Sequence, residues 1–173
     1  MTANGNLLVL CYGNPGRLDD GLGPAFGEAL EHENLAGVTV DIDYQLTVED
    51  AVTAAAHDAV LFVDAAVRGK APFFLHEVTP RAYLGFTSHG TEPEQVLDLA
   101  AGLAGTAPQG FAMGIRGYEF DEFGETLSAG AVANLAAALQ FMVPMILRHE
   151  LSTAAMVVGG SRLEEETAQD AVA

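Results

Sequence analysis

Residues 7–23 read LLVLCYGNPGRLDDGLG, and this stretch decides the fold. Its first residues are apolar without interruption, which predicts a buried β-strand over 7–12. A glycine-rich turn follows, and a helical pattern then runs through Pro24 to Glu31. A buried strand, a turn and a helix in this order start the alternation that is typical of α/β proteins.

The rest of the chain continues this alternation. We expect further strands over 38–44, 60–63, 73–78 and 110–115, and helices over 48–56, 91–103 and 131–147. The pattern predicts an α/β fold, a three-layer α/β/α sandwich with a mainly parallel, twisted sheet of about five strands. Residues 1–155 are expected to form a single domain, and residues 156–173 a mobile acidic tail.

Two helix boundaries are predicted from local chemistry. Thr91-Glu92-Pro93-Glu94 has the form of a capping box at the start of the helix over 91–103. Pro144 lacks a backbone N–H, so it should kink or end the helix over 131–147. That helix is almost long enough for a membrane span, but its apolar residues recur at helical spacing, which favours packing on a sheet.

Composition excludes several partners. The chain has 173 residues, with 7 Lys and Arg against 24 Asp and Glu, and a formal net charge of −17. So few basic residues cannot build a nucleic-acid site, and the same field repels anionic membranes. A single cysteine, Cys11, permits no internal disulfide, and it lies in a strand, as a core residue would. The start of the chain lacks the features of a signal peptide, so we expect a cytoplasmic protein.

The glycine-rich turn invites comparison with phosphate-binding loops, but it has neither their spacing nor their lysine. It carries two adjacent carboxylates instead, Asp19 and Asp20. These would oppose a phosphate at the N-terminus of the following helix. Since only one residue can be the cap of that helix, Asp19 is the stronger candidate for capping and Asp20 for chemistry.

Two other polar residues follow predicted strands, where the sites of open α/β sheets lie. Asp64 ends the most apolar strand, and either an ordinary salt bridge to Arg68 or a functional role would suit it. His89 lies in the loop before the helix over 91–103. Together with Asp20, these two side chains would make a facial set for a divalent transition metal.

The segments LVLCYGN (8–14), DDGLG (19–23), FVDA (62–65) and SH (88–89), in this order, resemble the hydrogenase maturation proteases. Those enzymes trim the C-terminus of the [NiFe]-hydrogenase large subunit, and the resemblance covers about residues 6 to 150. It implies that Asp20, Asp64 and His89 are the metal-contacting and catalytic residues. The first acid is often Glu in the family, so Asp20 is one methylene shorter.

The resemblance also implies the partner and the metal. The partner would be the large-subunit precursor, and its bound nickel would be recognised by the protease, so that cleavage follows metal insertion. Another divalent metal could occupy the site in isolation. The metal could polarise the scissile carbonyl or activate a water with a carboxylate as base. Relatives act as monomers, which we expect here.

A departure from the family follows the second strand, where many relatives carry an acid with Gly-Thr. Here Gln45 and Glu49 occur instead, and either could contact substrate, although Thr47 or Glu49 would also suit as a cap of the next helix. Two function classes stay open: a metal-checking endopeptidase, and a non-catalytic nickel-binding or sensing module on the same fold. A dinucleotide-binding enzyme would need a different first loop.

Overall fold

The computed structural model describes residues 5–82 and 90–159. The strands are β1 (Leu7–Tyr12), β2 (Val38–Asp43), β3 (Ala59–Ala66), β4 (Phe73–Val78) and β5 (Gln109–Arg116). A short 3₁₀ helix, η1 (Leu18–Gly21), precedes the α-helices α1 (Leu22–Glu33), α2 (Asp50–Ala55), α3 (Pro93–Ala104), α4 (Ala129–Leu147) and α5 (Leu151–Val158).

The strands form one five-stranded sheet in the order β2-β1-β3-β5-β4. Strands β1, β2, β3 and β5 are parallel, and β4 is an antiparallel edge strand paired with β5. The long apolar runs of β1 and β3 lie at the centre, where both faces are covered and uninterrupted hydrophobic sequence is required. The predicted mainly parallel α/β sandwich is confirmed.

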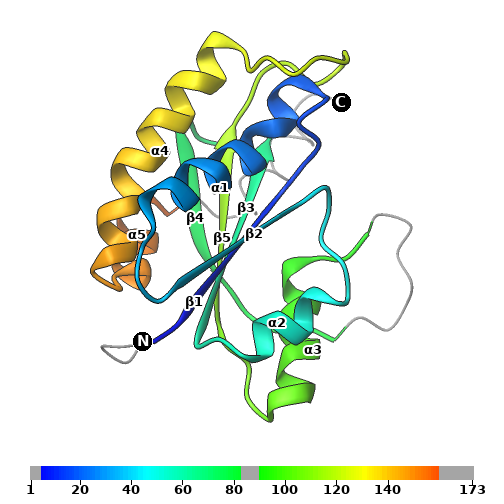
Figure 1. Ribbon diagram of the computed structural model, residues 1–173, viewed down its shortest axis with the longest axis vertical. Helices are drawn as coiled ribbons and strands as arrows, with labels where there is room; N and C mark the ends of the chain where they lie inside the picture. The colour runs from blue at the N-terminus through cyan, green and yellow to red at the C-terminus, as the bar shows by residue number, and fades with distance from the viewer. Residues whose placement is uncertain (1–4, 83–89, 160–173) are drawn as a thin grey trace, which may run out of the picture.

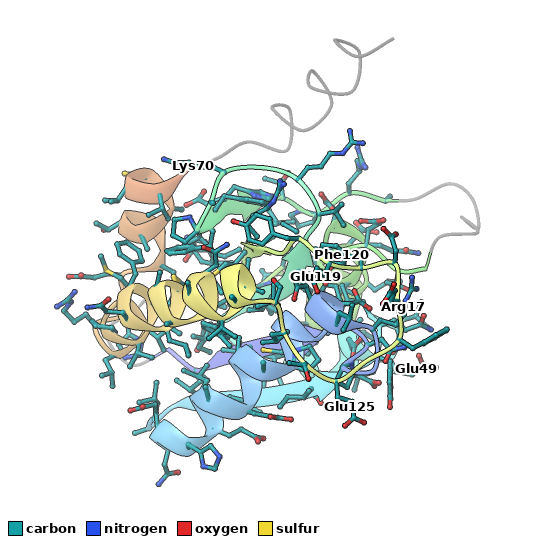
Figure 2. All side chains as sticks on the ribbon, turned by 90° about the horizontal axis from the view of Figure 1, so that it is seen from above. Arg17, Glu49, Lys70, Glu119, Phe120 and Glu125 are labelled. Atoms are coloured by element: carbon teal, nitrogen blue, oxygen red, sulfur yellow. The ribbon has the colours of Figure 1, made fainter. Side chains whose placement is uncertain are left out.

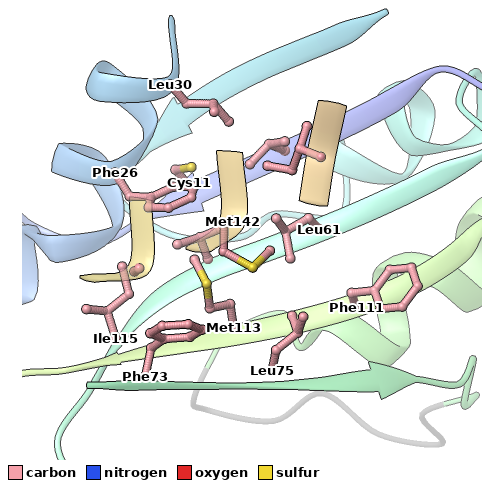
Figure 3. Close-up of a cluster of buried hydrophobic side chains, with 14 of the residues drawn as sticks. Cys11, Phe26, Leu30, Leu61, Phe73, Leu75, Phe111, Met113, Ile115 and Met142 are labelled. Carbon is pink, nitrogen blue, oxygen red and sulfur yellow. The ribbon is translucent and has the colours of Figure 1, made fainter. Parts of the chain in front are cut away.

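The helices divide between the two faces of the sheet. Helices α1, α4 and α5 cover one face, and α2 and α3 cover the other (Figure 1). Alternate residues of each strand supply the two cores, because successive side chains point to opposite faces. The larger core, between the sheet and helices α1, α4 and α5, contains the three phenylalanines and two methionines labelled in Figure 3.

The strand order creates a switch point between β1 and β3. From β1 the chain passes through α1 to β2 on one side, and then through α2 to β3 on the other side. The connections that leave the carboxyl ends of β1 and β3 therefore diverge, and a crevice opens between them. Asp64 lies in this position, since Cys11 pairs with Val63 across the two strands.

Not every helix end follows the prediction. Glu92, not Thr91, is the N-cap of α3, and its side chain makes no capping hydrogen bond, so the expected capping box is wrong. Pro144 lies inside helix α4, which ends at Leu147, where the sequence predicts its end. Helix α5 continues the folded part to Val158, beyond the expected boundary at 155. Residues 160–173, most of the expected tail, lie outside the described residues.

Helix α4 is long and apolar enough to cross a membrane, judged by length and composition alone. In the structure, one side of it packs onto α1, β4, β5 and α5. Buried residues on that side, such as Ala138, Met142 and Ile146, recur at the three- to four-residue spacing of a helix face. The predicted packing of this helix on the sheet is confirmed.

Candidate functional site

The first loop leaves β1 in a conformation that needs glycine. Gly13 has φ +143°, and a Cβ atom there would collide with the carbonyl oxygen of Asp20. A Cβ at Gly23 would collide with the carbonyl oxygens of Tyr12 and Val63. These two glycines let the start of α1 rest directly on the ends of β1 and β3, which brings Asp20 to the crevice.

A cavity of about 260 Å³ occupies the crevice and contains both predicted carboxylates. Asp20 and Asp64 line it together with Gln45, and the remaining lining residues come from the ends of β1 and β2 and the start of α3. The Oδ2 of Asp20 accepts a hydrogen bond of 2.9 Å from the Asn14 N–H, which orients this side chain within its loop. The structure thus brings two of the three predicted site residues together.

The environment of Asp64 favours its protonated form. Burial raises its pKa most, a hydrogen bond from the Ala65 N–H at 2.7 Å opposes this, and the charges of Asp20 and Glu92 raise it further. The result is a pKa of about 7, against 3.8 ordinarily. A carboxyl group with a pKa near neutral pH, next to a second carboxylate, is typical of a site that binds a cation or transfers a proton.

The salt bridge between Asp64 and Arg68, one of the two roles considered for Asp64, does not form. Within residues 5–82 and 90–159, the one salt bridge joins Arg148 to Glu150 at 3.1 Å. Arg68 is exposed in the loop after β3, and in the part of the chain that the structure describes no positive charge offsets the burial of Asp64. The pKa of Asp64 therefore rises, with burial as the largest cause.

We expect the metal-free protein to lose stability between about pH 4 and pH 7 because of Asp64. The unfolded chain releases this proton near pH 4, whereas the folded chain keeps it until about pH 7. Between these values the folded state binds more protons, so the free energy of unfolding falls as pH rises. Asp64→Asn should remove this fall in unfolding free energy and be more stable than wild type by about 4 kcal/mol at pH 8, since each unit of the pKa shift corresponds to about 1.4 kcal/mol. Urea unfolding of wild type and Asp64→Asn at pH 5 and pH 8 measures the effect. An equal change in unfolding free energy between these pH values for the two proteins would contradict it.

His89, the third predicted site residue, lies outside the described residues. Its neighbour Gly90 lines the cavity with Asp20 and Asp64. Among the described residues, no group of three or more His, Cys, Asp or Glu side chains is arranged to hold a metal ion. The structure therefore supplies two oxygen donors at one cavity, and His89 as a third contact stays a prediction.

Asp19 has a different role from the expected one. The N-cap of α1 is Gly21, without a side-chain cap, so neither acidic residue of the loop caps this helix. Asp19 is completely buried, and its carboxylate accepts hydrogen bonds from the N–H groups of Tyr118, Glu119 and Ser128 and from the Ser128 hydroxyl, at 2.7 to 3.0 Å. Burial raises its pKa, but the hydrogen bonds outweigh this and hold the pKa below its ordinary value.

Asp19 belongs to a wider seam between the first loop and residues 117–128. Backbone hydrogen bonds join Leu18 to Gly124, Gly124 to Gly16, and Asp19 to Glu119. The Arg17 guanidinium also donates to the carbonyl oxygen of Phe120 at 3.3 Å, and Figure 2 shows these side chains on the same side of the molecule. The loop that carries Asp20 is thus braced from outside the cavity.

Cys11 is a core residue, as predicted. It is 1% exposed, and burial, followed by the charges of Glu31 and Asp41, raises the pKa of its thiol. A thiol in this state is not a nucleophile at neutral pH.

The expected caps of α2 are wrong, because the side chain of the N-cap residue Glu49 makes no capping hydrogen bond. Instead, the Asp50 carboxylate accepts a hydrogen bond of 2.7 Å from the Thr47 N–H.

Sequence reasoning missed Tyr12 and Glu92 as site residues. Both line the cavity, and Glu92 contributes to the raised pKa of Asp64. The position of Glu92 could have indicated it, since it lies just before the start of a helix at the carboxyl edge of the sheet. The capping-box interpretation assigned the N-cap to Thr91 instead. Gln45, one of the two residues predicted as a candidate substrate contact, lies in the cavity lining.

No family model and no curated protein matches this sequence. Solved structures do match. The [NiFe] hydrogenase maturation protease HycI from Thermococcus kodakarensis has a TM-score of 0.64 at 20% identity, over 82% of this chain and 92% of that one. The hydrogenase maturating endopeptidase HybD from E. coli has a TM-score of 0.63 at 21% identity, over 83% and 93%. A hydrogenase 2 maturation peptidase from a Thaumarchaeota archaeon has a TM-score of 0.60 at 18% identity, over 82% and 97%. The chain therefore has the fold of the [NiFe]-hydrogenase maturation proteases.

Proposed function

We propose that this protein is an endopeptidase that removes the C-terminal extension of a nickel-loaded [NiFe]-hydrogenase large-subunit precursor. The fold it shares with the maturation proteases supports this proposal. One observation carries it: the carboxylates of Asp20 and Asp64 line one cavity at the switch point of the sheet, where α/β proteins bind their ligands. We further propose that the protein works as a cytoplasmic monomer.

In this proposal, nickel belongs to the substrate and is the recognition element. The donor set fits such a cation, since carboxylate oxygens and an imidazole are ligands that divalent transition metals accept. Asp20 and Asp64 would contact the metal, and His89 would be the third contact. Burial, and after it the charges of Asp20 and Glu92, raise the pKa of Asp64 and disfavour its ionised form, and an arriving cation would offset this.

The residues of this chain then act by binding and by holding a proton. Asp20, oriented by the Asn14 N–H, would present a fixed oxygen to the metal. Asp64 would release its proton when the metal binds and afterwards could accept one from an attacking water. The nickel itself would polarise the scissile carbonyl or the water. A precursor without nickel would bring no cation to the two carboxyl groups, so Asp64 would keep its proton and the precursor would bind poorly.

One experiment separates this proposal from a non-catalytic nickel-binding or sensing module. The purified protein is incubated with the large-subunit precursor in nickel-loaded and nickel-free forms, and the products are examined by mass spectrometry. We expect one defined cleavage, with loss of the C-terminal peptide, in the nickel-loaded sample alone. Binding of the loaded precursor without cleavage would support the sensing module and overturn the endopeptidase.

A further inference from the structure

Helices α2 and α3 leave part of their face of the sheet uncovered. Near the amino end of β5, the Leu97 side chain of α3 packs so closely on Gly110 that a Cβ atom there would collide with it. Towards the carboxyl end of β5, Ala112 lies on the same face and is only half-buried. On the neighbouring strand β4, Phe74 and His76 are half-buried as well.

A second cavity, of about 350 Å³, occupies this uncovered region, and we call it the β4–β5 slot. Its floor is formed by Ala112 and Gly114 of β5 and by Phe74 and His76 of β4. The two rings are stacked with their centroids 6.2 Å apart and an interplanar angle of 16°. Gly114 is required here, because a Cβ atom would run into the Phe74 ring. Phe74, Ala112 and Gly114 give this floor an apolar surface, which suits an apolar side chain.

The slot adjoins the cavity of the two carboxylates. Both are lined by Tyr12, Asp64, Glu92 and Pro93. A molecule lying in the slot would therefore have Asp64 beside it. An extended polypeptide is the occupant that can reach from the slot to the carboxylates and continue beyond them, because each of its residues spans about 3.3 Å.

Charged side chains of both signs line the slot. Asp64, Glu92 and Glu94 contribute carboxyl groups, and Arg68, in the loop after β3, contributes a guanidinium. Lys70 lies in the same loop, and Arg116 donates a hydrogen bond to its Gly69 carbonyl oxygen. Three of the seven Lys and Arg residues of this acidic chain thus gather around one loop. In Figure 2, Lys70 lies far from Arg17 and Glu49.

We propose that the β4–β5 slot binds the substrate polypeptide next to the scissile bond, with an apolar side chain against Phe74 and Ala112 and an acidic group facing Arg68. This inference rests on the proposed function, and it names the part of the substrate that the site selects. The floor supplies the apolar contact, and the exposed guanidinium supplies the charge that an acidic group would meet.

The test measures cleavage of the nickel-loaded precursor by three variants. Ala112→Leu fills the floor of the slot without changing Asp20 or Asp64, and it should lower kcat/KM about tenfold, as expected for a misfit of a few methylenes in an apolar pocket. Arg68→Gln should also lower kcat/KM. Arg148→Gln, an exposed arginine at the end of α4, is the matched control and should process like wild type. Thermal unfolding checks that each variant is folded, and Arg68 is exposed enough to tolerate the change.

A double-mutant cycle identifies the substrate residue that contacts Arg68. In the precursor, each Asp and Glu within about six residues of the scissile bond is replaced in turn by Asn or Gln. Six extended residues span roughly 20 Å, at about 3.3 Å per residue. If one of them meets Arg68, its replacement and Arg68→Gln have non-additive effects on kcat/KM. Wild-type rates for Ala112→Leu and Arg68→Gln, with normal processing by wild type, would overturn the slot and leave the proposed function intact. Absence of processing by wild type would overturn both.

Discussion

Asp20→Asn and Asp64→Asn are each expected to reduce processing of the nickel-loaded precursor by about 10²–10³-fold, the range seen when one preorganised electrostatic contact is removed. Each change keeps the size of the side chain and removes one negative charge from a cavity that holds both carboxylates. The metal would then meet a neutral amide oxygen at one of its contacts. The rate of release of the C-terminal peptide, followed by mass spectrometry, measures the effect.

The controls separate a local loss of charge from a general one. Asp41→Asn removes one charge from an exposed position on β2 and should process like wild type. Asp20→Glu keeps the charge and lengthens the side chain by one methylene, so it should retain much more activity than Asp20→Asn. Processing by Asp20→Asn and Asp64→Asn at the rate of wild type would show that these carboxylates do not contact the metal.

The second large effect concerns stability. Asp19→Ala is expected to lower the free energy of unfolding by about 3–5 kcal/mol, because it leaves buried donors without an acceptor. The carboxylate that is lost accepts four hydrogen bonds, and three of them come from backbone N–H groups that cannot turn elsewhere. Asp19→Asn should also destabilise, since its amide NH₂ would face these donors. Urea unfolding at pH 7 measures both changes.

The effect of Asp19 also has a pH signature of its own. Its pKa is lowered in the folded state, so its contribution is present above about pH 4 and is lost as pH falls through the folded pKa. Asp121→Ala is the matched control, since Asp121 is exposed in the same 117–128 segment, and surface changes of this kind stay within about 0.5 kcal/mol. Equal unfolding free energies for Asp19→Ala and the control would mean that the seam contributes little.

The fold could be predicted because the central strands have a simple pattern. Strands β1 and β4 begin and end where the sequence indicates, and β3 and β5 are longer than expected by a few residues at their ends. An uninterrupted apolar run is possible only where both faces are covered, so Leu7–Tyr12 indicates a central parallel strand. Helix α5 was harder to predict, because it is only eight residues long. Its mostly apolar residues give no clear alternation between an apolar and a polar helix face.

The candidate site could be predicted in part. Asp20 lies in the loop after β1 and Asp64 near the carboxyl end of β3, and parallel strands bring such positions to one edge of the sheet. Asp19 was placed wrongly because its partners lie about a hundred residues away, in a loop with no pattern of its own. The same limit applies to the salt bridge expected between Asp64 and Arg68, since closeness in sequence does not decide which way an exposed loop directs its side chains.

The sequence by itself determined the layered α/β fold, the central strands and the two carboxylates, because these depend on local periodicity and on the direction of parallel strands. Only the tertiary structure decided the surroundings of each carboxylate. Adjacent in sequence, Asp19 and Asp20 point to different surroundings, one into a cage of N–H donors and the other into a cavity. Burial and the charges of Asp20 and Glu92 likewise raise the pKa of Asp64 to about 7, and the packing of α2 and α3 leaves the β4–β5 slot open. These properties arise from segments that meet only when the chain is folded, so no local pattern records them.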